Sequence, residues 1–420
     1  MKLERTALSS RVAVIGLGYV GLPTAVSLAI NGVEVLGVDT SREKVRAINS
    51  GRFRSDEPSL DEALDTALTD GRFRATTDIE PCDDYIIAVP TPLANDHRLD
   101  DSYIRAAVAS IAQVAKAGDL IILESTSPPG TTRKIAERMR ELRPDLCGRA
   151  DSYSDWKILF AHCPERVLPG NALEEIREND RIIGGVNTLA TDRAHQLYKS
   201  FCVGRIETTD DLTAELTKLV ENTFRDVNIA FANELSMVCD RLGADVWEVI
   251  SLANNHPRVN ILQPGPGVGG HCIAVDPWFL VASDPNTPLV QTARKVNDFK
   301  PLWVSEKIEH VAARIPESPI ALLGLAFKAD IDDLRESPAI EVVKRLADKL
   351  PDRQFLIVEP HIEHLPESLA ALKNLTLSDL ESALETAPIV GLLVDHQEFR
   401  RVDSRLLSGK RVVDTRGVWR

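Results

Sequence analysis

The chain has 420 residues, of which 44% are hydrophobic and 27% are charged. This is the composition of an ordinary globular protein, and the length allows two or three domains. The formal net charge of −14 argues against nucleic acid as a partner, because phosphate backbones bind basic surfaces. No run of about 18 apolar residues occurs, so no membrane-spanning helix is expected. The amino terminus also lacks an apolar signal region, and we therefore expect a cytoplasmic protein.

The chain opens with the pattern strand, glycine-rich turn, helix, strand. Its parts are apolar residues 11–15, the turn Gly16-x-Gly18-x-x-Gly21, a helical stretch at 22–31 and a second apolar run at 33–38. In this setting the glycines allow a tight turn and let the backbone approach a pyrophosphate at the start of the helix. Asp39, which ends the second run, is suited to bind the adenosine ribose and would repel a 2′-phosphate. The segment predicts a dinucleotide site that prefers NAD to NADP.

More strands are expected in the first half, and they alternate with helical stretches. They are predicted at 84–89, 120–124, 157–161 and 181–185. This alternation is typical of a parallel, doubly wound sheet. Two strands end in Ser/Thr/Pro loops, at 90–92 and 124–132. Ligands bind at the carboxyl ends of such strands, so these hydroxyls could contact the cofactor or hold a water, or could serve only as turn residues.

One long helix is expected at 211–242, because apolar residues recur at a period of roughly 3.6, with further helix to about residue 253. Lys218, Asn222 and Arg225 lie at positions i, i+4 and i+7 of this helix. They therefore share one face. Taken alone, the three could form either a functional face or a solvated polar stripe.

A loop rich in glycine and proline, residues 263–270, interrupts the helical region, and Cys272 follows it closely. Backbone amides in such a loop can approach a ligand, and a thiol near cations can act as a nucleophile. Taken alone, a single cysteine is more often structural. The other cysteines form no CxxC pair and are expected to be reduced core residues, so neither disulfides nor a metal site is predicted.

The last third repeats the alternation of strands and helices. Its strands are predicted at 319–323, 354–358, 389–394 and 411–413. The first of them runs into Gly324-Leu-Ala-Phe-Lys328, which lacks the three-glycine pattern, so its ligand should differ from that of the first unit. We predict an α/β protein with two Rossmann-like, doubly wound parallel-sheet domains, joined by a long central helix, with the active site between them.

Six segments carry a family resemblance. They are GLGYVGLP, ESTSPPGTT, CPERVLPG, ENTFRDVNIAFANEL, GPGVGGHCIAVDP and GLAFKADIDDLRESP. In the order and spacing of these segments, the chain resembles the UDP-glucose/GDP-mannose 6-dehydrogenase family over essentially its whole length. Within the family it looks most like the bacterial branch that oxidises UDP-N-acetyl-D-mannosamine, on the segments 163–170, 254–279 and 413–420. The resemblance implies an NAD-binding domain at 1–207, a central helical linker and dimerisation domain with the cysteine loop at 208–300, and a UDP-sugar-binding domain at 301–420.

The resemblance also implies a role for each matching position. The catalytic set would be Cys272 as nucleophile, Lys218 as acid/base with Asn222, and Thr126, Glu165 and Asp276 in handling water. The NAD-binding set would be Gly16, Gly18, Tyr19, Val20, Gly21, Asp39, Thr91 and Thr132, with Arg335 in the cofactor region. The substrate-binding set would be Arg166, Val167, Lys218, Asn222, Arg225, Gly269, Phe327 and Lys328, with His256 and Arg258 reaching into a neighbouring subunit's site.

The activity implied is an NAD-dependent, four-electron oxidation of UDP-N-acetyl-D-mannosamine to UDP-N-acetyl-D-mannosaminuronate, through a thiohemiacetal and a thioester on Cys272. A homodimer or larger homo-oligomer and a role in polysaccharide biosynthesis would go with it. The basic side chains of the substrate-binding set would hold the diphosphate despite the acidic net charge.

Three alternatives stay open. UDP-N-acetylglucosamine or UDP-glucose could be the substrate. The protein could be a two-electron β-hydroxyacid dehydrogenase, which needs neither Cys272 nor a second nucleotide domain. It could also be a non-catalytic sensor of nucleotide sugars.

Overall fold

The computed structural model describes residues 11–55, 57–94, 97–149, 152–167 and 170–419. The amino-terminal ten residues and residues 168–169 of the CPERVLPG segment lie outside the described residues. The chain divides into two compact units, Met1–Val220 and Glu221–Arg420, and the border falls inside one helix, α8 (Asp211–Leu242). Within the described ranges, no helix is long and apolar enough to cross a membrane.

The first unit is built on an eight-stranded sheet in the order β3-β2-β1-β4-β5-β6-β7-β8. The strands are β1 (Arg11–Ile15), β2 (Glu34–Val38), β3 (Phe73–Thr76), β4 (Asp84–Ile87), β5 (Leu120–Leu123), β6 (Leu159–His162), β7 (Arg181–Gly185) and β8 (Ile206–Asp210). Neighbours pair in parallel, except that β6 and β7 run antiparallel. The order reverses at β1, whose two neighbours are β2 and β4.

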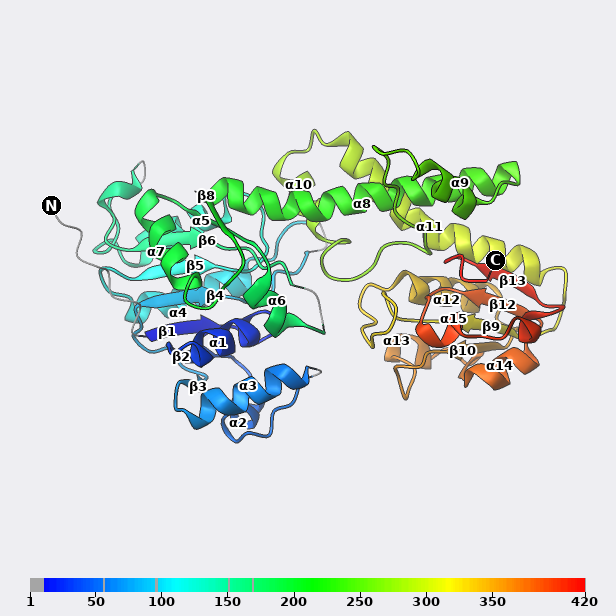
Figure 1. The fold of residues 1–420 in the computed structure, drawn as a ribbon, viewed down its shortest axis with the longest axis horizontal. Helices are drawn as coiled ribbons and strands as arrows, with labels where there is room; N and C mark the ends of the chain where they lie inside the picture. The colour runs from blue at the N-terminus through cyan, green and yellow to red at the C-terminus, as the bar shows by residue number, and fades with distance from the viewer. Residues whose placement is uncertain (1–10, 56, 95–96, 150–151, 168–169, 420) are drawn as a thin grey trace. The chain divides into compact units, whose positions relative to one another are not determined.

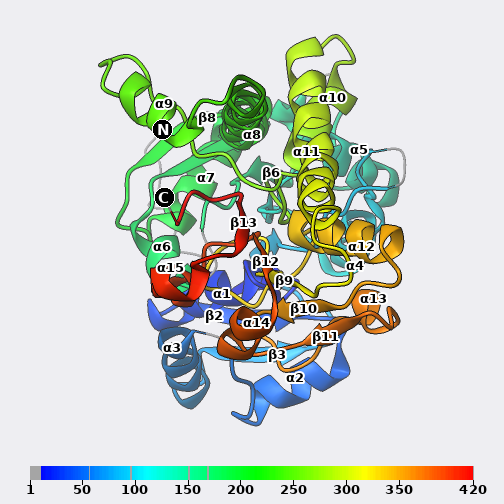
Figure 2. The same cartoon turned by 90° about the vertical axis from the view of Figure 1, so that its right-hand side faces the viewer.

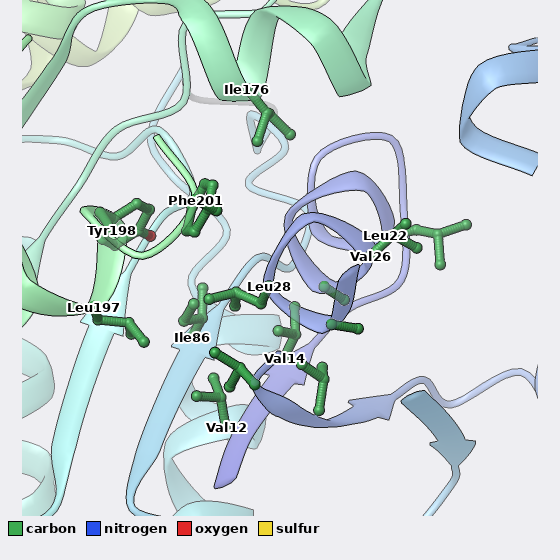
Figure 3. Close-up of a cluster of buried hydrophobic side chains, with 14 of the residues drawn as sticks. Val12, Val14, Leu22, Val26, Leu28, Ile86, Ile176, Leu197, Tyr198 and Phe201 are labelled. Atoms are coloured by element: carbon green, nitrogen blue, oxygen red, sulfur yellow. The ribbon is translucent and has the colours of Figure 1, made fainter. Parts of the chain in front are cut away.

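Helices cover both faces of this sheet, because the central strands are apolar on both sides. On one face, Val12 and Val14 pack under α1, α2, α3, α6 and α7; on the other, Ala13 and Ile15 pack against α4 and α5 (Figures 1 and 3). These helices are α1 (Gly21–Ile30), α2 (Arg42–Asn49), α3 (Pro58–Thr69), α4 (Ser102–Val114), α5 (Thr131–Leu142), α6 (Ala172–Glu178) and α7 (Thr188–Tyr198).

The second unit begins with helices and ends with a five-stranded parallel sheet in the order β11-β10-β9-β12-β13. The strands are β9 (Ile320–Leu323), β10 (Phe355–Val358), β11 (Leu375–Leu377), β12 (Ile389–Leu392) and β13 (Arg411–Asp414). Helices α11 and α12 contribute to the core on one face, and α14 and α15 to the core on the other (Figure 2). The helices of this unit that follow α8 are α9 (Val246–Ala253), α10 (Asp276–Ser283), α11 (Pro288–Ala312), α12 (Pro338–Lys349), α13 (Glu367–Ala370), α14 (Leu380–Thr386) and α15 (Gln397–Arg400).

The predicted fold class is confirmed, and the long helix at 211–242 has the predicted bounds. The helix does not continue directly to residue 253: Gly243, with φ 72°, ends it in the left-handed conformation that glycine adopts at helix ends. Three strands were not predicted, namely β3, β8 and β11. All three are edge strands, and β8 is largely exposed and lacks the apolar run that marks a buried strand.

Candidate active site

The glycine-rich turn between β1 and α1 has the geometry that a dinucleotide pyrophosphate needs. Gly16 has φ +94°, and a Cβ there would lie 2.4 Å from the carbonyl oxygen of Ala88. A Cβ on Gly21 would lie 1.8 Å from the carbonyl oxygen of Gly16, so the first turn of α1 can pack this closely only without a side chain. Gly18 instead faces open space, with no atom within 4 Å of its would-be Cβ. The turn therefore fits a bound pyrophosphate at the start of α1.

Asp39 ends β2 beside this turn. Its Oδ2 accepts a hydrogen bond from the Leu17 amide at 3.1 Å, and its Oδ1 accepts one from the Ser41 amide at 2.9 Å. Lys44 Nζ lies 3.6 Å from the same carboxylate. A carboxylate has room for about four hydrogen bonds, so the fixed group can still receive two ribose hydroxyls. In the same turn, Tyr19 is exposed and Val20 is half-buried.

The three threonines of the strand-end loops have different settings. Thr91 after β4 and Thr126 after β5 are half-buried. Thr132 is buried in the first turn of α5, where its amide and its hydroxyl each donate to Glu215 Oε1 at 2.7 Å. The Gly130 amide donates to the other oxygen of Glu215 at 2.5 Å. The loop after β5 is thus tied to the first turns of α8, and the hydroxyl of Thr132 already donates a hydrogen bond within the protein.

Glu165 and Lys218 form a buried pair of opposite charge in the first unit. Both side chains are at least nine-tenths buried. Burial raises the pKa of Glu165 to about 7, and the nearby charge of Lys218 opposes this shift. Glu165 also accepts a hydrogen bond from the Val167 amide, which helps to fix the orientation of its carboxyl group. A carboxyl group that titrates near neutral pH can give and take protons under working conditions.

The raised pKa of Glu165 predicts a pH dependence of stability. Between its ordinary value of 4.5 and about 7, the folded protein holds a proton that the unfolded chain has lost, so the free energy of unfolding falls as pH rises through this window. We expect the difference between wild type and Glu165→Gln, measured by urea unfolding, to fall by up to roughly 3 kcal/mol over that window and to be constant above it. The exposed Glu178→Gln is the control, and a flat difference for Glu165→Gln would contradict the prediction.

The polar face of α8 reaches the cysteine loop through one hydrogen bond. Asn222 Nδ2 donates to Asp276 Oδ2 at 2.5 Å. Asp276 is buried at the start of α10, and its amide donates to the carbonyl oxygen of Cys272 at 2.8 Å. Arg225, the third residue of the predicted face, is exposed. Two hydrogen bonds therefore link Asn222 to Asp276, and Asp276 to the backbone of Cys272.

Cys272 differs from the other cysteines of the chain. All six are free thiols, and Cys272 is the exposed one, whereas the others are buried or half-buried. Its neighbour His271 has a pKa lowered by partial burial and by the charge of Arg335. The guanidinium of Arg335 also interacts electrostatically with Cys272. An exposed thiol beside a cation is the setting in which cysteine acts as a nucleophile.

The loop after β9 packs against the cysteine loop. A Cβ on Gly269 would lie 2.4 Å from the Glu336 carbonyl oxygen and 3.0 Å from Phe327 Cβ. Phe327 is half-buried, while Lys328 and Arg335 are exposed. Two residues of this loop, Asp330 and Glu336, have positive φ angles of 62° and 51°. Strained backbone of this kind persists where the surroundings fix it, often at ligand sites.

The second sheet also has an acidic residue, Glu359, at the position that Asp39 holds in the first sheet. Its carboxylate is hydrogen-bonded to groups of its own unit. Glu359, which follows β10, accepts from the amides of Leu325 and Ala326 at 2.7 and 3.0 Å and pairs with His396 Nε2 at 3.1 Å. His396 Nδ1 accepts from the Asp330 amide at 2.9 Å. Because both ring nitrogens are occupied, His396 offers no lone pair to a cation, although Asp330 and His361 lie nearby. The second unit is therefore not built to receive an adenosine ribose here.

The remaining predicted substrate residues lie on loops. Arg166 is half-buried and Val167 buried after β6, with an Arg166 N–H donating to the Asp180 carbonyl at 3.0 Å. His256 and Arg258 are exposed in the loop after α9, where the Arg258 amide donates to His256 Nδ1 at 3.3 Å.

Comparison with known protein families decides the affiliation of the chain. Three domain descriptions of one family match it in order: the NAD binding domain at residues 10–202, the central domain at 212–299 and the UDP binding domain at 321–420. The chain belongs to the UDP-glucose/GDP-mannose dehydrogenase family. It is an NAD-dependent UDP-sugar dehydrogenase, and the glycine-rich turn described above fits the cofactor of this family.

Individual relatives of this dehydrogenase cover nearly its whole length. It is 53% identical to the NDP-N-acetyl-D-galactosaminuronic acid dehydrogenase of Ralstonia nicotianae, over 97% of this chain and 96% of that one. It is 49% identical to the UDP-N-acetyl-D-mannosamine dehydrogenase of Escherichia coli K12, over 97% and 99%. Among solved structures, the UDP-D-ManNAc dehydrogenase of Pyrococcus horikoshii is similar with a TM-score of 0.84 and 37% identity, over 97% and 96%.

Glu215 is a residue of this dehydrogenase that the sequence analysis missed. It is fully buried, and burial raises its pKa to about 7 although three hydrogen bonds from Gly130 and Thr132 oppose the shift. It precedes Lys218 by three positions and so lies on the same side of α8. That spacing is a signal that could have drawn attention to it, but its partners lie more than 80 residues earlier, where no local pattern points.

Proposed function

We propose that the enzyme oxidises the 6-hydroxymethyl group of UDP-N-acetyl-D-mannosamine to a carboxylate, in two successive oxidations with Cys272 as covalent nucleophile. The observation that carries the proposal is the Asn222–Asp276 hydrogen bond, which ties the polar face of α8 to the turn that exposes Cys272. A two-electron alcohol dehydrogenase has no use for a nucleophilic thiol at this place. Bound NAD supplies the hydride acceptor in both oxidations.

In the first oxidation, the hydroxyl group must lose its proton as the carbon loses a hydride. Lys218 is a buried side chain, and its amino group is suited to pass on this proton and to stabilise the charge that develops on the oxygen. Asn222 lies one turn further along the same face of α8. Its amide nitrogen carries two N–H groups, so it can donate to Asp276 and to the substrate oxygen at the same time.

The second oxidation starts from the aldehyde. The Cys272 thiolate adds to the aldehyde carbon, and a proton on the new oxygen completes a thiohemiacetal. Loss of the second hydride from carbon, together with loss of the hydroxyl proton to a base, leaves a thioester. Water then adds to the thioester carbon and the thiolate leaves, which releases the carboxylate. Thr126 and Asp276 are suited to position this water, and Glu165, with its pKa near 7, is suited to accept a proton from it.

The choice of sugar rests on the relatives. The chain is 49% identical to proteins named UDP-N-acetyl-D-mannosamine dehydrogenase and 53% identical to proteins named NDP-N-acetyl-D-galactosaminuronic acid dehydrogenase. An N-acetylated sugar is common to both names. The second candidate is therefore the N-acetyl-D-galactosamine nucleotide, which the sequence analysis did not consider.

A panel of UDP-sugars tests both the sugar and the electron count. With purified enzyme and saturating NAD, we expect UDP-N-acetyl-D-mannosamine to have the highest kcat/KM, and each molecule consumed to yield two NADH by absorbance. UDP-glucose, UDP-N-acetylglucosamine and UDP-N-acetylgalactosamine are the comparison substrates. Equal or better turnover of UDP-glucose would reject the sugar assignment. A yield of one NADH would reject the four-electron reaction and favour a two-electron dehydrogenase.

A further inference from the structure

Buried polar side chains line the contact between α8 and α11. Facing positions of two packed helices are normally apolar, because a buried polar group costs free energy unless it is hydrogen-bonded. Here six polar or charged residues are at most 8% exposed. We call them the polar ladder; they are Asp226, Asn233 and Ser236 of α8, and Arg294, Asn297 and Lys300 of α11.

The ladder begins at a carboxylate, which can only accept hydrogen bonds. Asp226 Oδ1 accepts from Arg294 Nη1 at 2.6 Å and from Asn297 Nδ2 at 2.8 Å. Asn297 must therefore turn its amide nitrogen toward Asp226 and its amide oxygen away from it. That oxygen, Asn297 Oδ1, accepts from Asn233 Nδ2 at 2.9 Å. The charge on Asp226 thus fixes the orientation of both asparagine side chains.

One bond of the ladder leaves the two helices. Asn233 Oδ1 accepts a hydrogen bond from the amide of Gly265 at 2.9 Å, and both groups are buried. Gly265 begins the glycine-rich segment of the loop that leads to Cys272. The orientation imposed by Asp226 is what presents an acceptor, rather than a donor, to this amide. At the other end of the ladder Lys300 donates to Ser236, and within the described part of the chain we observe no hydrogen bond from this end to the loop.

The loop has two further fixed points before and after Cys272. The Gly270 amide donates to the Arg335 carbonyl oxygen at 3.3 Å. Gly270 also has φ +82°, and a Cβ there would lie 2.8 Å from the ring of Phe327. After Cys272, Asp276 is held by Asn222. The thiol is therefore exposed on a short segment whose ends are fixed, and the bond from Asn233 fixes the start of the loop.

We propose that Asn233 is a positioning residue: the relay from Asp226 through Asn297 to Asn233 holds the Gly265 amide and so fixes the loop that presents the Cys272 thiol. The inference rests on the proposed function for its catalytic consequence, because Cys272 is the nucleophile there. Its structural content, a fixed Gly265 amide, stands independently of the reaction.

Hydrogen exchange of the wild-type enzyme tests this structural content without a substitution. We expect the Gly265 amide, resolved by fragmentation of the peptide that contains it, to exchange as slowly as amides inside α8, because it is buried and bonded. Exchange of Gly265 at the rate of exposed loop amides would overturn the proposal, whatever any variant does.

Variants then test the relay. Asn233→Leu keeps the side-chain volume but removes the acceptor, and we expect Gly265 exchange to become roughly tenfold faster or more. The rate of acid formation from the aldehyde should fall by a similar factor, while the dissociation constant of NAD stays within about twofold. Asn297 itself does not hydrogen-bond to Gly265, but Asn297→Ala should also speed exchange of the Gly265 amide. The double variant should exchange this amide no faster than Asn233→Leu alone.

Ser236→Ala is the matched control, because it removes the bonds of Ser236 to Lys300 and to the Asn233 carbonyl oxygen but leaves the Asn233 side chain that accepts from the Gly265 amide. It should leave Gly265 exchange and acid formation unchanged. Unchanged exchange in folded Asn233→Leu would overturn the anchoring role, and an effect of Asn297→Ala that simply adds to that of Asn233→Leu would overturn the relay. If Cys272→Ser still forms acid while the exchange results hold, the proposed function fails and the anchor of the loop remains.

Discussion

Replacing Cys272 by serine is expected to lower the rate of acid formation by roughly 10³-fold or more, because serine has no thiolate to form the thioester. The first oxidation does not need the thiol. In a single turnover with excess enzyme, the variant should therefore release one NADH per UDP-sugar and stop at the aldehyde level, where the wild type releases two. Absorbance at the NADH band together with mass spectrometry of the sugar nucleotide measures both.

The substitution should be mild for the fold, because Cys272 is exposed and exposed positions tolerate small changes. NAD should bind with unchanged affinity, since the glycine-rich turn belongs to the other compact unit. Cys147→Ser, at a half-buried thiol, is the control for loss of a cysteine as such. Acid formation by Cys272→Ser at a near-wild-type rate would show that the covalent mechanism is wrong.

Replacing Lys218 by methionine should slow the first oxidation by about 10²- to 10⁴-fold, the usual contribution of a general acid or base. Methionine keeps the length and packing of the buried side chain but can neither take the proton nor carry the charge. The loss should appear in kcat under saturating NAD and UDP-sugar. Stopped-flow measurement of the first NADH formed separates this step from the second oxidation.

The same variant should also change Glu165. The charge of Lys218 counteracts the effect of burial on this carboxyl group, so the pKa of Glu165 should rise further when that charge is removed. Thr217→Ala, at the half-buried neighbouring position on α8, is the control for a change in the helix itself. A loss of kcat no greater than that of Thr217→Ala would remove Lys218 from the acid/base role.

The features that the sequence predicted well are those determined by neighbours along the chain. The turn from Gly16 to Gly21 with Asp39 at the end of the next strand is a local pattern, and the structure gives it the expected geometry. Helix α8 has the predicted bounds because its apolar period is continuous over many turns. The family resemblance, carried by short segments, is confirmed over all three domains.

The features that the sequence did not reveal depend on pairing between distant segments. The sequences of β6 and β7 are typical of buried strands, and neither sequence indicates that the two strands pair antiparallel. The same holds for Asn222 and Asp276, which are 54 positions apart, and for Asn233 and Gly265, which are 32 apart. Hydrogen bonds of this kind form only when the fold has brought the partners together.

The sequence by itself predicted the two α/β units and the dinucleotide turn, and the family resemblance implied the roles of the polar face of α8 and of Cys272. Only the tertiary structure decided which groups are buried, and hence that the pKa values of Glu165 and Glu215 rise to about 7. Only the tertiary structure also decided that Glu359 is hydrogen-bonded to Leu325 and His396 of its own unit, so that the second unit does not repeat the ribose site of the first. The physical reason is that periodicity and turn chemistry act between neighbouring residues, whereas desolvation and hydrogen bonding in a site act between residues that only the folded chain brings into contact.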